Sequence, residues 1–259
     1  MAAAGPRIRI RDAVPADAGA ITEINYAAFG PDIMDKLMYP NGVSDNARRK
    51  FESGLFAPKH PSAKGETIIK VAELLPVSDN DGPGEVVAFS KWVLYREPRP
   101  EAEWNVEHLD TAETLGEGVN VDVYNNFFGA MHRKRRQWAK GDPVLFLAIL
   151  ACTPTRHRLG AGTAMVRWGT ELADELGLPS MLEASPSGYG LYKKFGYEDI
   201  DVIDLNITER WGAAYDGRNW GKDNAVELAG PAPEGVSRTV VMRRPAKAKS
   251  STSTSMLHE

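Results

Sequence analysis

The sequence has little cysteine, no long apolar run and no large excess of charge of either sign. A single cysteine, Cys152, among 259 residues excludes an internal disulfide and is typical of a reducing compartment. The net charge of −4 does not favour a general nucleic-acid binder. No apolar run approaches the length of about 18 residues that a membrane span needs, and the N-terminal sequence MAAAGPRIRIRD lacks the apolar core of a secretory signal. We therefore expect a soluble protein of the cytoplasm, with the nucleus left open.

The composition is otherwise that of an ordinary globular protein. Hydrophobic residues make up 42% and charged residues 25% of the chain, which excludes global disorder. The C-terminal sequence AKAKSSTSTSMLHE has almost no apolar side chains, so residues 246–259 are predicted to be a disordered tail. We expect one domain over residues 1–245, enlarged by insertions at about 96–142 and 206–235.

The most informative stretch is 144–177, VLFLAILACTPTRHRLGAGTAMVRWGTELADELG. Residues 144–152 are apolar and predict a buried strand, which Pro154 prevents from continuing. Gly160 and Gly162 follow in a basic turn, and Gly177 is a plausible helix stop. Between these glycines, apolar residues recur at helical spacing: Met165, Trp168, Leu172 and Leu176. The pattern is therefore strand, glycine-rich turn, helix.

A turn of this kind can bind phosphate. Two glycines remove the side chains that would keep phosphate oxygens away from the backbone N–H groups, and the helix dipole adds roughly half a positive charge. Arg156, His157 and Arg158 add cationic groups just before the glycines. Taken alone, a helix start that merely contains glycines explains the turn equally well. The turn also lacks the Gly-x-Gly-x-x-Gly and Gly-Lys-Ser/Thr patterns of Rossmann and P-loop nucleotide sites.

The rest of the chain predicts a mixed α/β arrangement. Strands are expected at 7–11, 67–74, 85–95, 179–185, 197–205 and 236–243, and the turn residues at 79–84 join two of them into an antiparallel hairpin. Helices are expected from Pro15 to before Gly30 and at 45–55, 121–140 and 187–195. The basic run at 133–136 is interpreted as a solvated helix face rather than a binding patch.

Two motifs resemble those of the GNAT family of acyl-CoA N-acyltransferases. The segment ACTPTRHRLGAGTAM supplies Pro154, Gly160 and Gly162 at the family's offsets, with His157 where the family usually has Gln or Arg. The segment LYKKFGY, residues 191–197, looks like the family's Leu-Tyr-x-x-x-Gly-Phe/Tyr signature. The resemblance implies the GNAT fold, a central mixed, mostly antiparallel twisted sheet flanked by helices. It also implies acetyl-CoA as co-substrate and no metal.

The resemblance assigns cofactor contacts residue by residue. The pantetheine arm would lie along the strand end, and the turn amides would bind the pyrophosphate, with Lys194 and Arg158 as further phosphate ligands or simply surface residues. The residues implied are Leu150, Ala151, Cys152, His157, Arg158, Leu159, Gly160, Ala161, Gly162, Thr163 and Lys194.

The resemblance also implies catalytic roles. Tyr192 stands where the family has the general acid that protonates the departing thiolate, although a tyrosine that only packs on the helix would look the same. Glu183 is the candidate base, with Asp122 and His132 as weaker ones; Glu183 could equally be an outward-facing residue or an ion-pair partner. A covalent intermediate on Cys152 is disfavoured because a cysteine ending an apolar strand usually behaves as a small hydrophobe. We therefore expect direct attack by the amine.

The acceptor is expected to be a small amine. The insertions carry many aromatic residues, and these would form an enclosed acceptor pocket if they fold over the acceptor side of the groove. If these residues lie elsewhere, they would only pack the insertions onto the sheet. The residues are Trp104, Tyr124, Phe127, Phe128, Trp138, Trp211, Tyr215 and Trp220. A protein or peptide acceptor, or a non-catalytic acyl-CoA-binding module, remain the alternatives.

Overall fold

The computed structural model describes residues 7–57, 65–75, 84–107 and 109–247. Its centre is one seven-stranded sheet with the order β1-β2-β3-β4-β5-β7-β6. Every neighbouring pair is antiparallel except β4 and β5, which are parallel, so the expected mixed, mostly antiparallel sheet is confirmed. The strands are β1 (Arg7–Asp12), β2 (Glu66–Leu75), β3 (Glu85–Tyr95), β4 (Val144–Cys152), β5 (Ser180–Ala184), β6 (Glu198–Asn206) and β7 (Val236–Arg244).

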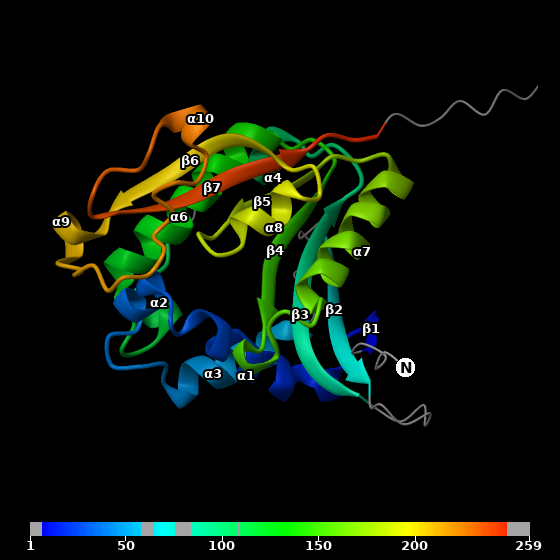
Figure 1. Ribbon diagram of the computed structural model, residues 1–259, viewed down its shortest axis with the longest axis horizontal. Coiled ribbons are helices and arrows are strands. Elements are labelled where there is room, and N and C mark those ends of the chain that lie inside the picture. The colour runs from blue at the N-terminus through cyan, green and yellow to red at the C-terminus, as the bar shows by residue number, and fades with distance from the viewer. Residues whose placement is uncertain (1–6, 58–64, 76–83, 108, 248–259) are drawn as a thin grey trace, which may run out of the picture.

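Helices cover both faces of this sheet (Figure 1). On one face, α1 (Ala18–Phe29) packs Ile21 and Ile24 against Phe89 and Ala151, and α6 (Val121–Ala139) covers the far end of the sheet. The opposite face carries α7 (Ala161–Leu176) and the short α8 (Tyr189–Lys193). The remaining helices are α2 (Ile33–Met38), α3 (Asp45–Leu55), α4 (Glu101–Trp104), α5 (Ala112–Leu115), α9 (Ile207–Trp211) and α10 (Val226–Ala229).

The helix α7 lies very close to the sheet because Gly169 faces Trp92. A Cβ on Gly169 would come within 2.1 Å of the Trp92 ring, which is fully buried. The helix ends as the sequence predicts, since Gly177 adopts the left-handed conformation with φ +67° and its amide bonds back to the last turn. This packing sets where the other end of α7, with its glycine turn, meets β4.

The strands β4 and β5 separate soon after they meet. They pair only from Leu145 to Leu147, opposite Ser180 to Leu182. A register shift between Lys91 and Trp92 of β3 leaves Ala148 of β4 as the extra residue of a β-bulge. Beyond the bulge, β4 stays paired with β3 up to Cys152, while its other edge faces away from β5. The sheet therefore has an internal opening next to the second half of β4.

The basic run on α6 is not the solvated face expected from the sequence. Lys134 pairs with Asp201 of β6 at 2.6 Å, Arg135 binds Glu183 of β5, and Arg136 donates to the carbonyl of Val106. These contacts join α6 to the β5–β7–β6 end of the sheet. The prediction was wrong because the partners are distant in sequence.

The segment 206–235 is held by a buried arginine. Arg238 of β7 is 1% exposed and binds both carboxylate oxygens of Asp204 at 2.7 Å. Its remaining donors reach the carbonyls of Asn224 and Gly230 inside the insertion. Removing a buried guanidinium from four such contacts leaves several acceptors unsatisfied, so this side chain determines how the insertion folds.

Several sequence expectations can be compared directly with the structure. Strands at 85–95 and 144–152 and the helix at 45–55 have the expected bounds, whereas α2 lies between Gly30 and residue 45, where no helix was expected. The hairpin tip at 79–84 lies outside the described residues except for Gly84, and so does most of the C-terminal tail. Across the described part of the chain, no helix is long and apolar enough to cross a membrane.

Candidate active site

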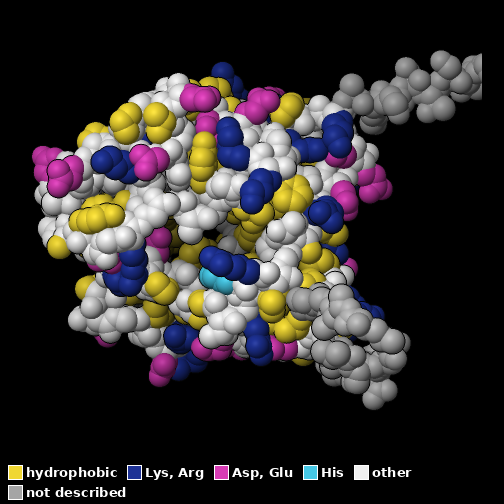
Figure 2. All heavy atoms as spheres, in the orientation of Figure 1, with side chains coloured by type: hydrophobic (Ala, Val, Ile, Leu, Met, Phe, Trp, Pro, Cys, Tyr) yellow, Lys and Arg dark blue, Asp and Glu magenta, His cyan; other side chains and the backbone are white. Residues whose placement is uncertain are grey.

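The opening in the sheet lies at the bottom of a surface hollow. Figure 2 shows the surface hollowed near the middle of the molecule, between the half that carries β5–β7 and the half that carries α1–α3. The second half of β4, the start of α7 and α8 meet around this region (Figure 1). Because β4 and β5 have parted there, an extended ligand arm can lie between the two strands and reach both faces of the sheet.

The glycine turn has the geometry of an anion site. Gly160 caps α7 with φ +89°, and a Cβ built on it would meet no atom within 4 Å. The space in front of it is therefore open, and the first-turn amides of α7 have no acceptor within the helix. Arg158 precedes Gly160 with φ +64°. Arg156, by contrast, binds Glu85 at 2.8 Å, which fixes the turn to β3. The turn therefore fits a pyrophosphate.

Cys152 ends β4 directly beside this turn. Its sulfur accepts a hydrogen bond from the amide of Gly162, and a Cβ on Gly162 would lie 3.4 Å from that sulfur. Burial raises the pKa of the Cys152 thiol to about 11, although the amide opposes the shift. The thiol is therefore protonated near neutral pH and is a poor nucleophile.

Tyr192 of α8 lies close enough to Cys152 for the two groups to interact electrostatically. The tyrosine is 7% exposed, and burial raises the pKa of its hydroxyl above the ordinary value of 10. No hydrogen bond among the described residues engages that hydroxyl. The ring edge packs on Gly188, where a Cβ would come within 3.0 Å. Tyr192 is thus a protonated, buried donor near the residue that ends β4.

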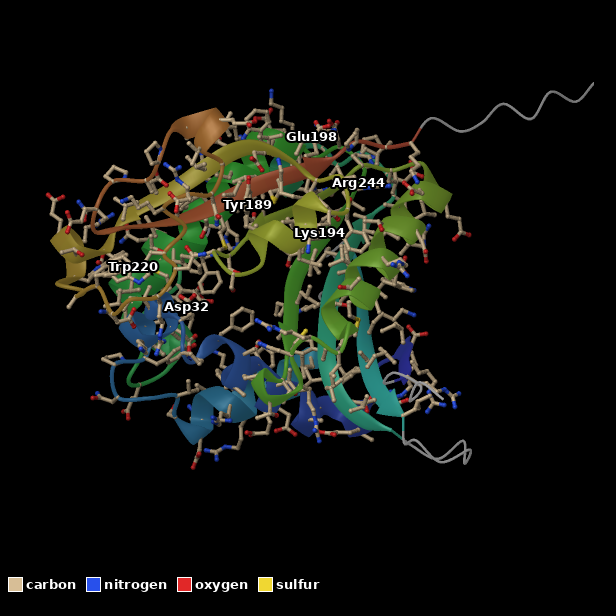
Figure 3. All side chains as sticks on the ribbon, in the orientation of Figure 1. Asp32, Tyr189, Lys194, Glu198, Trp220 and Arg244 are labelled. Atoms are coloured by element: carbon tan, nitrogen blue, oxygen red, sulfur yellow. The ribbon has the colours of Figure 1, made fainter. Side chains whose placement is uncertain are left out.

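The neighbouring tyrosines have structural partners. Tyr189 donates to Asp199 at 2.8 Å, which joins α8 to β6, and Ser180 donates to the hydroxyl of Tyr197 at 2.9 Å. Figure 3 shows Tyr189 and Lys194 on and beside α8. Lys194 is exposed at the C-terminal end of α8. These contacts hold α8, and with it Tyr192, in a defined position.

Glu183 faces α6 and takes part in a bidentate ion pair. The Nε and Nη2 atoms of Arg135 each donate to one of its carboxylate oxygens at 2.8 Å, and the Glu183 side chain is 3% exposed. The guanidinium of Arg135 also lies 4.2 Å from the centroid of Phe146. Of the two alternatives left open by the sequence, the ion-pair partner is the one found. The ion pair therefore occupies both carboxylate oxygens of Glu183.

Asp122, a weaker candidate, lies elsewhere. It accepts the indole N–H of Trp211 at 2.7 Å and so joins the start of α6 to α9. The insertions' aromatic residues divide into two groups. Tyr124, Phe127, Phe128, Trp211 and Trp220 pack in one cluster with α2, whereas Trp138 packs on the sheet and donates to Asp201. Trp104 lies against Gly141, and Tyr215 is exposed beside Trp220.

The structure adds a second group of polar residues that the sequence analysis missed. Asp35 of α2 lies near the tyrosines Tyr26 and Tyr39, whose pKa values are raised chiefly by burial and further by its charge. Burial, followed by the charge of Asp32, raises the pKa of Asp35 to about 6. Asp32 caps α2 by accepting the amide of Met34 at 2.8 Å. The sequence Asp32-x-x-Asp35 before an apolar segment is a helix-start pattern and could have revealed α2.

Comparison with known proteins was made at the level of sequence and of structure. The sequence matches no family model and no curated protein. The structure is similar to an agmatine N-acetyltransferase, with a TM-score of 0.55 and 10% identity over 91% of this chain and 98% of that one. The structure is also similar to a Drosophila melanogaster polyamine N-acetyltransferase, with a TM-score of 0.54 and 12% identity over 92% of this chain and 99% of that one. A third similar structure is from Corynebacterium glutamicum and is described as histone acetyltransferase HPA2 and related acetyltransferase. Its TM-score is 0.53, with 17% identity over 95% of this chain and 99% of that one.

These similarities span nearly the whole of each chain. At identities this low they establish the fold rather than the reaction. The protein therefore has the GNAT fold of the N-acetyltransferases.

Proposed function

We propose that the protein is an acetyl-CoA-dependent N-acetyltransferase in which an amine, on a small molecule, attacks the thioester directly. The observation that supports this best is the proximity of the buried Tyr192 to Cys152, which ends β4 beside the glycine turn. A turn that could bind phosphate and a buried phenol would then lie near the same thioester. The agmatine and polyamine N-acetyltransferases that share the fold act on small amines, which supports the acceptor class.

The turn and the strand would hold acetyl-CoA. The amides of residues 158–163 would bind the pyrophosphate, apart from that of Gly162, which donates to Cys152; His157 would lie at the edge of the turn and Lys194 would be a further cation. The pantetheine arm would run along the free edge of β4 beside Leu150, Ala151 and Cys152. This path brings the thioester next to Tyr192, with the acceptor entering from the α1–α6 face.

The reaction requires that a neutral amine attacks the carbonyl carbon, the C–S bond breaks, and the thiolate receives a proton. Tyr192 would donate a hydrogen bond or its proton to that sulfur. Because its pKa lies above 10, complete transfer before bond cleavage is unfavourable, and donation concerted with departure is the better route. Glu183 is the proposed acceptor of the amine's proton. Since Arg135 occupies both its oxygens, it would act through their remaining lone pairs and a water molecule.

One experiment tests the proposal. The purified protein is incubated with acetyl-CoA and a panel of polyamines, amino acids, arylamines and histone-like peptides, and free thiol is followed. We expect thiol release with small amines and intersecting initial-rate plots, as direct attack requires. Thiol release with peptides alone would indicate that the acceptor is a protein or peptide. Calorimetric CoA binding without thiol release across the panel would instead indicate a non-catalytic CoA-binding module.

A further inference from the structure

The helix that carries Tyr192 is short and depends on contacts from outside it. α8 spans only Tyr189–Lys193, and a helix of this length is not stable by its own backbone hydrogen bonds. On one side, Asp199 of β6 accepts hydrogen bonds from the first and the last side chain of the helix, at 2.8 and 3.3 Å. The turn before the helix has a second support, which comes from the segment 206–235. The position of Tyr192 therefore depends on both supports.

Two asparagine side chains of the segment 206–235 bind the turn that leads into α8. The amide groups of Asn219 and Asn224 each donate to the carbonyl oxygen of Pro186 at 3.3 Å. A carbonyl oxygen has two lone pairs, so both hydrogen bonds can form at once. Asn219 is exposed, whereas Asn224 is only 9% exposed. Because the loss of a buried hydrogen bond leaves its partner unsatisfied, Asn224 is the stronger of the two supports.

The backbone of Asn224 is itself held at both of its polar groups. Its N–H donates to the carbonyl of Gly221 at 3.0 Å, and its carbonyl accepts a hydrogen bond from Nη1 of Arg238 at 3.1 Å. Arg238 is buried in β7 and bound to Asp204 of β6, so Asn224 is attached to the sheet. A residue fixed in this way can define the position of the turn that its side chain binds.

The residue after Asn224 has an unusual backbone conformation. Ala225 is not a glycine, and yet it lies in the left-handed region, with φ +52° and ψ +36°. It is buried and packs in the same cluster as Tyr189 and Tyr192 of α8. Strained residues of this kind persist only where the surrounding structure imposes the conformation, and they occur often at functional sites. The strain therefore lies in the cluster that contains Tyr192, directly after the residue that binds Pro186.

We propose that Asn224 is a positioning residue for Tyr192: its side-chain amide holds the turn at Pro186 and thereby places the phenol next to the thioester. This inference rests on the proposed function, in which Tyr192 donates to the departing thiolate. Asn224 itself takes no part in bond making. The segment 206–235 then contributes to the chemical step, whatever acceptor is used. A displacement of about 1 Å can cost a factor of about 100 in rate, so loss of this support should be measurable in kcat.

The test combines Asn224→Ala with Tyr192→Phe in a double-mutant cycle. Asn224→Ala removes the side-chain amide and keeps the backbone carbonyl that Arg238 binds. With the best amine of the panel, it should lower kcat about tenfold and leave the KM for acetyl-CoA within about twofold of wild type, because the phenol moves and the glycine turn does not. In the Tyr192→Phe background the same change should lower kcat by less than about twofold, since residues that act as a unit are not additive. An equal loss of kcat in both backgrounds, or no loss in either, would overturn the inference.

Asn206→Ala is the matched control. Asn206 lies at the start of the same segment and caps α9 by accepting the amide of Glu209 at 3.1 Å, so its loss should destabilise the segment and leave the contact at Pro186 intact. We expect both alanine variants to unfold at lower urea concentrations than wild type. The kcat of Asn206→Ala should stay within about twofold of wild type, because changes that share no partner act independently. A tenfold loss in this control as well would make the effect of Asn224→Ala one of general destabilisation and overturn the inference.

Amide hydrogen exchange separates this inference from the proposed function. The amides of residues 185–195 should exchange faster in Asn224→Ala than in wild type, and at the wild-type rate in Asn206→Ala, whether or not acetyl transfer occurs. Unchanged exchange in Asn224→Ala would overturn the inference even in an active enzyme. Absence of thiol release by the wild-type protein with every amine would contradict the proposed function, and the exchange rates would then decide whether Asn224 positions Tyr192.

Discussion

The amide of Gly162 donates a hydrogen bond to the sulfur of Cys152, so the first turn of α7 is attached to the last residue of β4. One of the few amides that a helix start leaves unsatisfied is thereby used inside the protein. The contact fixes the distance between the glycine turn and the strand that would carry the pantetheine arm. It also occupies one lone pair of the sulfur. Together with burial, it affects the reactivity of the Cys152 thiol.

Cys152 should be dispensable for turnover. At pH 7.5 a thiol with a pKa of about 11 is ionised to only about 0.03%, which is too little for a covalent acyl intermediate at useful rates. We expect Cys152→Ala to keep kcat within about threefold of wild type and iodoacetamide to modify the folded protein slowly. Mass spectrometry of the quenched reaction should show no acetylated protein. Loss of activity in Cys152→Ala together with a trapped acetyl-cysteine would contradict direct attack.

Tyr192→Phe should separate chemistry from binding. It removes the hydroxyl that we propose as the proton donor to the departing sulfur and leaves the ring packing on Gly188 unchanged. General acids contribute on the order of 100-fold or more, so kcat should fall about 100-fold with little change in the KM for acetyl-CoA. Tyr197→Phe, which removes the hydroxyl that Ser180 binds on the other side of α8, is the control and should leave kcat nearly unchanged. Parallel changes in kcat and KM would give Tyr192 a binding role.

Gly160→Val should impair binding of acetyl-CoA. A β-branched residue at φ +89° costs about 1–2 kcal/mol, and its side chain would fill the space that the phosphate requires. Gly42 offers a matched control, since it has φ +80° and no atom near a Cβ, but lies far from the turn in sequence. Both variants should lose similar stability in urea. Only Gly160→Val should raise the Kd for CoA, by about tenfold or more, in calorimetry.

Asp35→Asn should stabilise the protein at neutral pH. The folded-state pKa of about 6 lies above the value of 3.8 for an unperturbed aspartate, so folding favours the protonated form. The contribution of this group is therefore fully favourable below about pH 4 and is lost as the pH rises through 6. Allowing for its partial exposure, the variant should gain on the order of 1–2 kcal/mol at pH 7.5 and nothing at pH 4. Urea unfolding at the two pH values measures both. A variant less stable at pH 7.5 would mean that Asp35 has a stabilising partner.

Arg135→Met should destabilise the protein far more than a change in a surface pair. It leaves the 3% exposed carboxylate of Glu183 without its guanidinium, which should cost about 2–3 kcal/mol. Arg96→Met breaks a pair in which both side chains are 52% exposed, and should cost less than about 1 kcal/mol. Adding Glu183→Gln to Arg135→Met should recover part of the loss, as denaturant unfolding would show. No recovery in the double variant would indicate that Arg135 acts through its packing on Phe146 instead.

Much of the fold could be predicted because its signals are local. The apolar segment of β4 and the left-handed Gly177 act within a few residues, and their positions in the structure agree with expectation. The turn before α7 could be located for the same reason. The joint occurrence of that turn and the segment at 191–197 was enough to predict the GNAT fold, although no family model matches the sequence.

The features of the fold and of the site that the sequence did not predict depend on contacts between residues far apart in the chain. Arg135 and Glu183 are 48 positions apart, so neither the ion pair nor the true role of the basic run is visible in the sequence. The bulge at Ala148 follows from a mismatch between two strands and has no signature in either of them. Asp35 of α2 and Tyr26 of α1 lie on different helices, and only the folded chain brings their charges close enough to interact.

The short pairing of β4 with β5 has a consequence for how the protein unfolds. The two halves of the sheet are joined along only Leu145 to Leu147, and beyond that point no backbone ladder connects these strands. A pantetheine arm lying in the opening would contact both halves at once and act as a non-covalent cross-link between them. Without ligand, the protein should therefore exchange amide hydrogens fastest where β4 and β5 separate. With acetyl-CoA bound, the two halves should unfold together, in a single and more cooperative transition.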